Sequence, residues 1–401
     1  MNTEELKITP QKRIMDNCDT LEDIILSECS PIIKKYNIDD NAIKEIITKA
    51  IVPAQEFSRK LWQLYNETMS NCPDIFQVVD AELFLRVIKH IRSVVYQKIE
   101  NRNVGISIVI YSKEDDISNS NSDYDMQASI SRDKEINDTK DYFDDLHNEL
   151  KRAYKGIDSH KAFFAFVYNK AAKTIVFKGI RTFNSASIEQ ICLDNQVGFN
   201  VSEGVPCIRI YTKGNHILDY IINESTGDWM IRIKENIKEI IGKQINLNPK
   251  DLVIITEIVL QLSYLRIGAM LIITSERDNF INNPSTYELK SFYLEENYHS
   301  GLIYQYAAND GAVIIQYEQG KRLKIYKIGV ILNPTGDMYE KSTYKSLVES
   351  NNCGSRHEKA ARYACEHPSD CIIVVSENRS ISILHGPEPI YWRDDPNPLK
   401  K

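Results

Sequence analysis

Apolar residues recur with two different spacings along this chain of 401 residues. Between residues 20 and 100 they fall every three or four positions, as at Leu83, Val87 and Ile88, which is the spacing of helices with one buried face. From residue 104 onward they alternate with polar residues or form short branched and aromatic runs, which are typical of strands. The pattern therefore predicts helices between residues 20 and 100, and mainly strands from residue 104 to about residue 231.

The strands predicted before residue 235 are short and are separated by turn-forming residues. They cover residues 104–111, 163–167, 174–177, 208–211, 217–220 and 229–231. Lys213-Gly214-Asn215 and Ser225-Thr226-Gly227-Asp228 stand between successive strands and favour hairpins. Helices followed by hairpins predict an α+β domain over residues 1–235.

One segment inside this first domain carries few apolar residues. Residues 112–141 are dense in Asp, Ser, Asn and Glu, so they lack the apolar surface that would compensate the entropy of ordering them. We interpret the segment as a flexible acidic insertion. A regulatory role remains an alternative, but the composition favours a solvated loop.

After residue 245 longer helices alternate with buried strands. Residues 234–243 predict a connecting helix, and Asn246-Leu247-Asn248-Pro249 predicts a break after it. The later elements are predicted as helices at 252–265 and from 355 to 365, and as strands near 267–273, 311–317, 323–332, 371–376 and 380–384. This alternation predicts an α/β domain over residues 245–392, with a sheet flanked by helices.

The most hydrophobic stretch, residues 252–273, does not have the composition of a membrane span. Glu257, Gln261 and Arg266 interrupt it, and it is better explained as a helix followed by a buried strand. The first residues contain no apolar core of a secretory signal. We therefore expect a soluble cytoplasmic protein without a membrane partner.

Composition narrows the classes of partner. The net charge is −7 at pH 7, 42% of the residues are hydrophobic and 26% are charged. These values are ordinary for a globular protein, and the negative balance argues against broad nucleic-acid binding. The eight cysteines contain no C-x-x-C pair, so free thiols are favoured over a disulfide framework or a zinc site.

Two short segments near the C-terminus suggest nucleotide chemistry. Asp310-Gly311-Ala312 places a carboxylate at the start of a strand, beside a glycine that lets a ligand approach the backbone. Gly354-Ser355-Arg356-His357 places small residues and an arginine at a helix N-terminus, where free N–H groups and the helix dipole favour phosphate. A carboxylate that can hold a divalent cation, together with an anion-binding turn, is what such chemistry requires.

These two segments resemble motifs of the diadenylate cyclase family, which joins two ATP molecules into cyclic di-AMP. Arg266 to Ile273, containing Gly268-Ala269-Met270, is similar to the family's Gly-Ala-Leu strand, which lies against the adenine. Residues 373–377, which include Ser376-Glu377, are similar to its Val-Ser-Glu strand, and Ile381-Ser382 to the hairpin partner after it. The resemblance covers residues 245–392, with four segments in the family's order.

The resemblance implies a nucleotidyltransferase that makes cyclic di-AMP and two pyrophosphates from ATP. It implies Asp310, Arg356 and His357 as catalytic residues, and Asp310 and Glu377 as ligands of Mg²⁺ or Mn²⁺. The residues implied to contact ATP lie on the strands and the turn named above: Gly268, Ala269, Met270, Gly311, Ala312, Gly354, Ser355 and Ser376. It also implies a C-terminal mixed sheet flanked by helices, and pairing of two cyclase domains face to face.

Each of these residues also has an interpretation that needs no ligand. Asp310 could end a strand, Ser355 could cap the helix, and Arg356 could be a solvated surface residue. His357 could be a buried structural histidine, and Glu377 an ordinary polar residue at a strand end. The apolar strand at Gly268–Met270 has the same pattern whether or not it lines a pocket.

The chain departs from the family's pattern at three positions. Glu358 stands where a second arginine is common, and would repel a triphosphate if it faced the pocket. Lys359 restores a positive charge, but about 100° further around the helix. Asn309 stands where many members of the family have a histidine, and Asn378 stands where a second glutamate is common. A catalytically silent nucleotide-binding sensor is therefore the main alternative, and a related nucleotidyltransferase that makes a different nucleotide is a second one. The first domain is expected to sense an unknown ligand.

Overall fold

The computed structural model describes the chain in segments. The described residues are 65–95, 98–99, 102–103, 105–113, 162–182, 188–192, 194–202, 205, 207–222, 229–275, 285–287, 292–294, 297–308, 311–317, 322–335, 337–350 and 353–394. The chain divides into two compact units, Met1–Lys89 and His90–Lys401. The predicted domain border between residues 235 and 245 falls inside the second unit and stays a prediction.

The described part of the first unit is helical. Residues 65–71 are helical, α3 spans Ile75–Val78, and α4 begins at Ala81 and continues to Val95 in the second unit. The side chain of Asp80 accepts a hydrogen bond from the Leu83 backbone N–H at 2.8 Å, which caps the start of α4. The predicted helical spacing is confirmed here, because its apolar positions are buried: Leu83, Val87, Ile88 and Ile91.

In the second unit a two-stranded sheet of β1 (Lys98–Ile99) and β2 (Arg102–Asn103) is followed by a seven-stranded sheet. Its strands lie in the order β5-β4-β3-β6-β7-β8-β9. Their bounds are Thr174–Thr182, Ala162–Asn169, Ile106–Tyr111, Gln196–Val201, Cys207–Thr212, Asn215–Ile222 and Trp229–Ile233. Only β3 and β4 pair in parallel; the other neighbours are antiparallel. The predicted β7–β8 hairpin is confirmed, whereas the turn predicted at 225–228 and most of the acidic insertion lie outside the described residues.

An eight-stranded mixed sheet follows, in the order β11-β14-β13-β10-β15-β16-β17, with β12 also paired to β14. Its longer strands are β10 (Ala269–Thr274), β13 (Ala312–Gln316), β14 (Lys324–Val330), β15 (Cys371–Val375), β16 (Ile381–His385) and β17 (Glu388–Tyr391). The short strands are β11 (Ser285–Tyr287) and β12 (Phe292–Tyr293). Here too a single pair is parallel, β10 with β13.

The two sheets share one connectivity. If the short strands β11 and β12 are set aside, the first six strands of each sheet lie in the spatial order 3-2-1-4-5-6. In both, the first and second strands are the parallel pair, and the second and third strands pair with a shift of register. Gly179 on β5 and Gly329 on β14 stand beside these shifts, with φ of 105° and 62°. The N-terminal sheet therefore repeats the strand arrangement of the C-terminal one.

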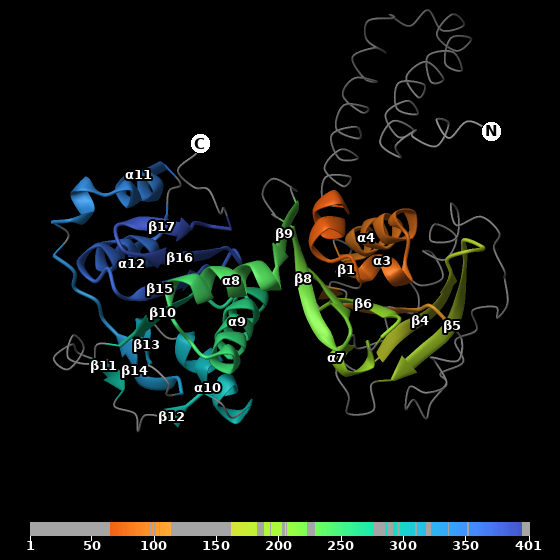
Figure 1. The fold of residues 1–401 in the computed structure, drawn as a ribbon, viewed down its shortest axis with the longest axis horizontal. Coiled ribbons are helices and arrows are strands. Elements are labelled where there is room, and N and C mark those ends of the chain that lie inside the picture. Colours follow the sequence, from red (N-terminus) through yellow and green to blue (C-terminus); the bar gives the residue numbers. More distant parts are fainter. Residues whose placement is uncertain are drawn as a thin grey trace, which may run out of the picture. The chain divides into compact units, whose positions relative to one another are not determined.

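Helices cover both faces of the C-terminal sheet (Figure 1). One face packs against α8 (Lys234–Gln244), α9 (Pro249–Tyr264) and α10 (Asn297–Ala307). The other packs against α11 (Thr343–Ser350) and α12 (Ser355–Glu366), with the short 3-10 helix Tyr339–Lys341 beside them. This is the predicted α/β arrangement, in which every strand residue of β10, β13 and β15 is buried.

The hydrophobic stretch after residue 250 divides as predicted into a helix and a strand. Asn248 caps α9 by accepting a hydrogen bond from the Asp251 N–H at 3.0 Å, and Pro249 occupies the first helical position. Leu265 to Gly268 connects α9 to β10, and Arg266 in this connection has a φ of 60°. Among the helices of the described segments, none is long and apolar enough to cross a membrane.

Candidate active site

The predicted phosphate-binding turn lies at the start of α12. Gly354 is the N-cap residue, and Ser355 is the first residue of the helix. The cap is therefore a glycine without a side chain, and Ser355 does not take the capping position that one interpretation of the sequence gave it. Farther along α12, small residues are buried against the sheet and hold the helix close to it: Ala360, Ala361 and Ala364.

Arg356, in the first turn of α12, lies directly over Gly268, the residue that precedes β10. A Cβ atom at Gly268 would collide with Nη1 of Arg356, and it would lie 3.1 Å from Cγ of Glu377. Three residues predicted from separate motifs therefore meet at one place. The glycine lets the guanidinium lie in this position, because any side chain at residue 268 would displace it.

His357 follows Arg356 and points to the end of β15. Its Nε2 lies 3.4 Å from Oγ of Ser376, and its ring meets that of Trp392 edge to face, with centroids 5.5 Å apart. Burial, followed by the charges of Arg393 and Arg356, lowers the pKa of His357 from 6.5 to about 4. The imidazole is therefore neutral at pH 7 and acts as a hydrogen-bonding group rather than as a cation.

The predicted adenine wall on β10 has two faces. Met270 is buried with the side chains of α12, on the face over which Arg356 lies. Ala269 belongs to the core on the opposite face, with α9 residues such as Ile258 and Leu262. Alternation along the strand thus separates the two side chains, and Met270 is the one directed to the face of the candidate site.

The Asp-Gly-Ala segment is described from its glycine onward. Asp310 and Asn309 lie outside the described residues. Gly311 has a φ of 105°, and a Cβ there would stand 2.6 Å from the carbonyl carbon of Gly329. The close approach that this glycine permits is therefore to the backbone of β14. Ala312 begins β13 and is fully buried.

Glu377 is the predicted metal ligand that the structure describes. It is exposed in the hairpin between β15 and β16, beside Gly268. A carboxylate oxygen is the type of ligand that Mg²⁺ and Mn²⁺ take, so the chemistry of this donor fits such an ion. The described segments contain no group of three or more His, Cys, Asp or Glu side chains that could hold a metal by themselves. The second predicted ligand, Asp310, lies outside the described residues.

Glu358 has a partner on its own helix. Arg362 donates to Oε1 of Glu358 from Nε at 3.1 Å and from Nη2 at 2.8 Å. The guanidinium of Arg362 also stacks over Tyr339, 4.5 Å from the ring centroid. This contact directs the Glu358 carboxylate along α12 toward the 3-10 helix. Glu358, which stands where the family often has an arginine, is therefore held in an ion pair with Arg362.

Asn378, another departure, shapes the hairpin that carries Glu377. Its Oδ1 accepts hydrogen bonds from the N–H of Ser380 at 3.2 Å and from its hydroxyl at 2.9 Å. Arg379, the next residue, has a φ of 75°. The backbone of Arg266 is also in the left-handed region, and its Nε donates to the carbonyl of Glu377 at 3.2 Å.

Sequence reasoning missed one basic residue of this region. Arg393 follows β17. After burial, its charge is the largest cause of the low pKa of His357. Its side chain also hydrogen-bonds the thiol of Cys353, immediately before the turn. No motif surrounds Arg393 in the sequence, and only the fold brings the end of β17 back to the start of α12.

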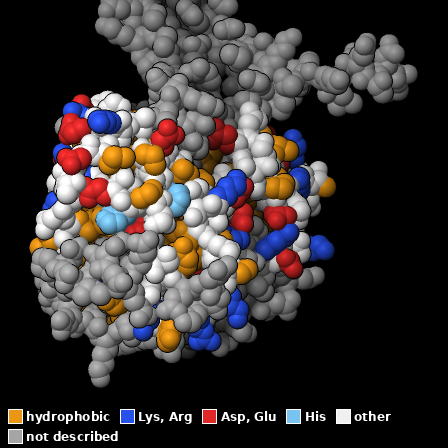
Figure 2. All heavy atoms as spheres, turned by 60° about the vertical axis from the view of Figure 1, so that its left-hand side comes forward, with side chains coloured by type: hydrophobic (Ala, Val, Ile, Leu, Met, Phe, Trp, Pro, Cys, Tyr) orange, Lys and Arg blue, Asp and Glu red, His pale blue; other side chains and the backbone are white. Residues whose placement is uncertain are grey.

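The face of the molecule on the side of the C-terminal sheet carries charges of both signs. Figure 2 shows acidic and basic side chains interspersed, with hydrophobic side chains between them, over the part of this face that is described. No single sign of charge dominates it.

Comparison with known proteins identifies the C-terminal segment. Residues 257–388 match the family model described as "DisA bacterial checkpoint controller nucleotide-binding", the diadenylate cyclase domain. The predicted family resemblance is thereby confirmed for this segment, which contains α12 and every strand from β10 to β16. No curated protein matches the chain.

Two solved structures are similar to part of the chain. One is described as a hypothetical membrane spanning protein from Bacillus cereus: it is 17% identical, with a TM-score of 0.28, over 38% of this chain and 69% of that one. The other is DacA from Staphylococcus aureus, as a double mutant: it is 17% identical, with a TM-score of 0.23, over 40% of this chain and 87% of that one. Both TM-scores are low, so the family match carries the identification.

Proposed function

We propose that the protein is a diadenylate cyclase, whose C-terminal domain joins two ATP molecules into cyclic di-AMP and releases two pyrophosphates. The observation that supports this most is the meeting of Arg356, Gly268 and Glu377 at the ends of the central strands β10 and β15, beside the contact between His357 and Ser376. These residues come from separate motifs, and they converge within the segment that matches the family model.

The chemistry requires a ribose 3′-hydroxyl to attack an α-phosphate in line while pyrophosphate leaves. Arg356 binds a phosphate through its guanidinium fork, and the free N–H groups in the first turn of α12 donate to further phosphate oxygens. Neutral His357 and Ser376 orient each other beside Arg356 without adding charge. Met270 lines the side of the strand on which the nucleotide lies.

A divalent cation is part of the proposal. Glu377 would hold Mg²⁺ or Mn²⁺ together with Asp310, and the ion would neutralise charge on the phosphate oxygens. One domain provides one such half-site. Because two ATP molecules react symmetrically, two half-sites must face each other, which a two-fold dimer of cyclase domains provides.

We propose that the protein works in the cytoplasm, where ATP is available. We also propose that its N-terminal domain regulates the cyclase activity in response to an unknown ligand. Its sheet is tied to α9 of the cyclase domain by buried side chains. Arg209 on β7 donates to Oε1 of Gln261 at 2.6 Å and to the carbonyl of Leu260 at 3.0 Å. These contacts supply a physical connection between the two sheets.

The first experiment incubates the purified protein with ATP and either Mg²⁺ or Mn²⁺, and identifies the products by mass spectrometry. Arg356→Gln and Asp310→Asn are expected to abolish cyclic di-AMP. Arg362→Gln, farther along the same helix, serves as the matched control and should retain it. ATP affinity, measured by calorimetry, accompanies each variant.

The outcomes separate an enzyme from a binding module. Cyclic di-AMP from the wild-type protein, lost in Arg356→Gln and kept in Arg362→Gln, supports the cyclase. ATP binding without any product would instead favour the silent nucleotide-binding sensor. A protein that neither binds ATP nor forms product would exclude both functions.

A further inference from the structure

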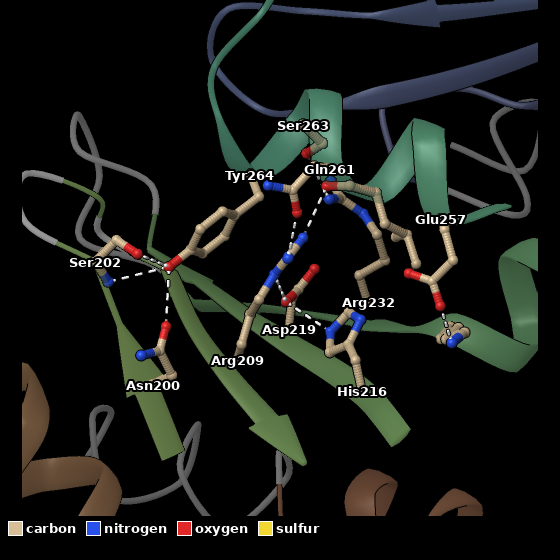
Figure 3. Close-up of polar contacts among 12 residues, drawn as sticks. Asn200, Ser202, Arg209, His216, Asp219, Arg232, Glu257, Gln261, Ser263 and Tyr264 are labelled. Carbon is tan, nitrogen blue, oxygen red and sulfur yellow. Dashed lines mark hydrogen bonds and ion pairs between the residues drawn. The ribbon is translucent and has the colours of Figure 1, made fainter. Parts of the chain in front are cut away.

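Arg232 is a buried arginine on β9, the last strand of the N-terminal sheet, and its side chain reaches the C-terminal domain (Figure 3). The side chain is 1% exposed. Nε and Nη2 donate to the two carboxylate oxygens of Asp394, each at 2.9 Å. Nη1 donates to Oγ of Ser263 and Nη2 to the carbonyl of Arg379, both at 2.6 Å. All three nitrogens of the planar guanidinium therefore donate hydrogen bonds.

Two of these partners stand immediately beside the candidate active site. Ser263 lies at the end of α9, just before the connection that leads to Gly268. Arg379 follows Glu377 in the hairpin between β15 and β16. The hydroxyl of Ser263 also donates to the carbonyl of Arg379 at 2.6 Å. Arg232 and Ser263 thus hold the hairpin against the end of α9 through one shared carbonyl oxygen.

The third partner links Arg232 to the chain after β17. The backbone of Asp394 donates to the carbonyl of Ile381 at 2.9 Å, and its Oδ2 accepts from the Ile381 N–H at 3.2 Å. Trp392, which packs on His357, lies two positions earlier in the same segment. Arg232 therefore contacts three segments next to the site: the end of α9, the hairpin between β15 and β16, and the chain after β17.

The hairpin itself has a backbone that needs support. The N–H of Ser376 donates to the carbonyl of Ser380, and the N–H of Arg379 donates to that of Ser376, both at 2.9 Å. Arg379 adopts a φ of 75°, which is unfavourable for a residue with a Cβ atom. Such a conformation persists where the surroundings fix it, and the carbonyl of Arg379 is the group that Arg232 binds.

We propose that Arg232 is a positioning residue for the nucleotide site: by holding the carbonyl of Arg379, it fixes the hairpin that presents Ser376 and Glu377. The N-terminal sheet thereby sets the geometry of the cyclase site. The identity of the nucleotide rests on the proposed function, whereas the placement of the hairpin does not depend on any ligand.

Arg209 offers a matched comparison on the same sheet. It too is a buried arginine bound to a carboxylate, with Nε 3.2 Å from Oδ1 of Asp219. It contacts the cyclase domain through Gln261 and the carbonyl of Leu260, and it stacks over Tyr264 with its Cζ 3.8 Å from the ring centroid. Within the described residues its hydrogen bonds reach α9 and none of them reaches the hairpin, so its substitution loosens the same interface away from the site.

The test compares Arg232→Lys with Arg209→Lys in the full chain. Lysine keeps the charge but cannot reproduce the fork, so each variant loses part of its hydrogen bonding while retaining its ion pair. Hydrogen exchange of residues 376–381 is measured by mass spectrometry without nucleotide. We expect exchange at this hairpin to be about tenfold faster in Arg232→Lys, because opening it costs less, and unchanged within about twofold in Arg209→Lys.

Kinetics supply the second readout. A displaced hairpin misplaces groups that act on the reacting phosphate, so kcat/KM for ATP should fall about 10- to 100-fold in Arg232→Lys, mainly through kcat. Arg209→Lys should stay within about threefold. If Arg232→Lys does not fold, Ser263→Ala removes one hydrogen bond to the same carbonyl and should change both readouts in the same direction by a smaller factor.

The two proposals fail in different ways. Absence of cyclic di-AMP from the wild-type protein counts against the proposed function, and the exchange measurement then decides the positioning role alone. Equal hairpin exchange in both lysine variants, or equal loss of kcat/KM in both, would overturn the positioning role. The first result means that Arg232 does not hold the hairpin, and the second that any weakening of the interface has the same effect.

Discussion

The guanidinium of Arg356 lies so close over Gly268 that no side chain fits at the glycine without moving it. Glu377 borders the same space from the hairpin that follows the neighbouring strand, β15. The start of α12, the start of β10 and the end of β15 are therefore packed together through a residue that has no side chain. The glycine matters because of what lies above it, since its own backbone has no positive φ.

Gly268→Ala should consequently impair nucleotide binding more than folding. The collision involves the end of a flexible arginine, which can swing away, so we expect unfolding free energy to change by less than about 1 kcal/mol. ATP affinity should fall about tenfold, because the displaced guanidinium no longer meets the phosphate. Calorimetric titration with ATP and thermal melting measure the two effects.

Gly301→Ala is the matched control for that substitution. Nothing lies within 4 Å of a Cβ at Gly301, in the helix α10, so alanine there should stabilise the protein by about 0.5–1 kcal/mol and leave ATP affinity unchanged. Wild-type affinity in Gly268→Ala would show that Arg356 does not need its observed position to bind nucleotide.

The low pKa of His357 predicts a specific dependence of stability on pH. Its pKa is about 4 in the folded protein and 6.5 in an exposed histidine, so the unfolded chain binds the proton more readily. The contribution is fully present above pH 6.5 and is lost as the pH falls toward 4, by up to about 3 kcal/mol. Urea unfolding at several pH values between about 7 and 4.5 measures it.

His357→Gln provides the reference, because glutamine can hydrogen-bond without titrating. The difference in unfolding free energy between wild type and variant should shrink or reverse as the pH falls through this window. Parallel curves for the two proteins would show that the histidine is protonated as easily in the folded state as in the unfolded one.

Local patterns predicted the helices and strands around the C-terminal sheet well, for a physical reason. The apolar run at residues 252–273 was predicted as a helix followed by a strand, and the structure has both, because the run is buried against the core. The helix begins earlier than predicted: Asn248 and Pro249, interpreted as a break, are its N-cap and its first residue. The residues of the candidate site carry signals of their own, since glycines, an arginine and a carboxylate at element ends have few structural alternatives in combination. Gly268, Arg356 and Glu377 could therefore be selected from the sequence as candidates, and the structure shows that they lie close together.

The contacts between the sheets left no such signal. Arg232 stands in a short strand among apolar residues, and its partners are up to 162 positions away. The common connectivity of the two sheets likewise depends on which strands pair. The spacing of apolar residues does not predict pairing between strands that are far apart in the sequence. The sequence predicted α+β structure for residues 1–235, but it did not show that six strands of the N-terminal sheet have the same order as those of the C-terminal sheet.

Glu358→Gln tests whether that residue marks a loss of activity. Because its carboxylate is bound by Arg362 on its own helix, we expect the substitution to leave kcat/KM for ATP within about twofold. Stability should fall by about 0.3–0.5 kcal/mol, the usual contribution of an ion pair of this spacing. A large gain in ATP affinity would show instead that Glu358 repels the triphosphate.

Asp219 should be among the costliest residues to substitute in the N-terminal sheet. It is 1% exposed and lies 2.9 Å from Nε2 of His216 and 3.2 Å from Nε of Arg209. Burial alone would raise the pKa of Asp219, but the neighbouring His216 and Arg209 outweigh it and hold that pKa well below its usual range. Asp219→Asn leaves Arg209 buried without its counter-charge, and we expect unfolding free energy to fall by about 3–5 kcal/mol.

The pH dependence of that loss distinguishes it from the effect of His357. Because the folded pKa of Asp219 is depressed, its contribution is complete above its unfolded pKa of about 4 and disappears only as the pH falls further. The gap between wild type and Asp219→Asn should therefore stay constant from about pH 7 to pH 5 in urea unfolding. Glu235→Gln, which breaks an exposed ion pair with Lys238, should cost less than about 1 kcal/mol. If Asp219→Asn costs no more than that control, the buried charges at this interface contribute no net stability.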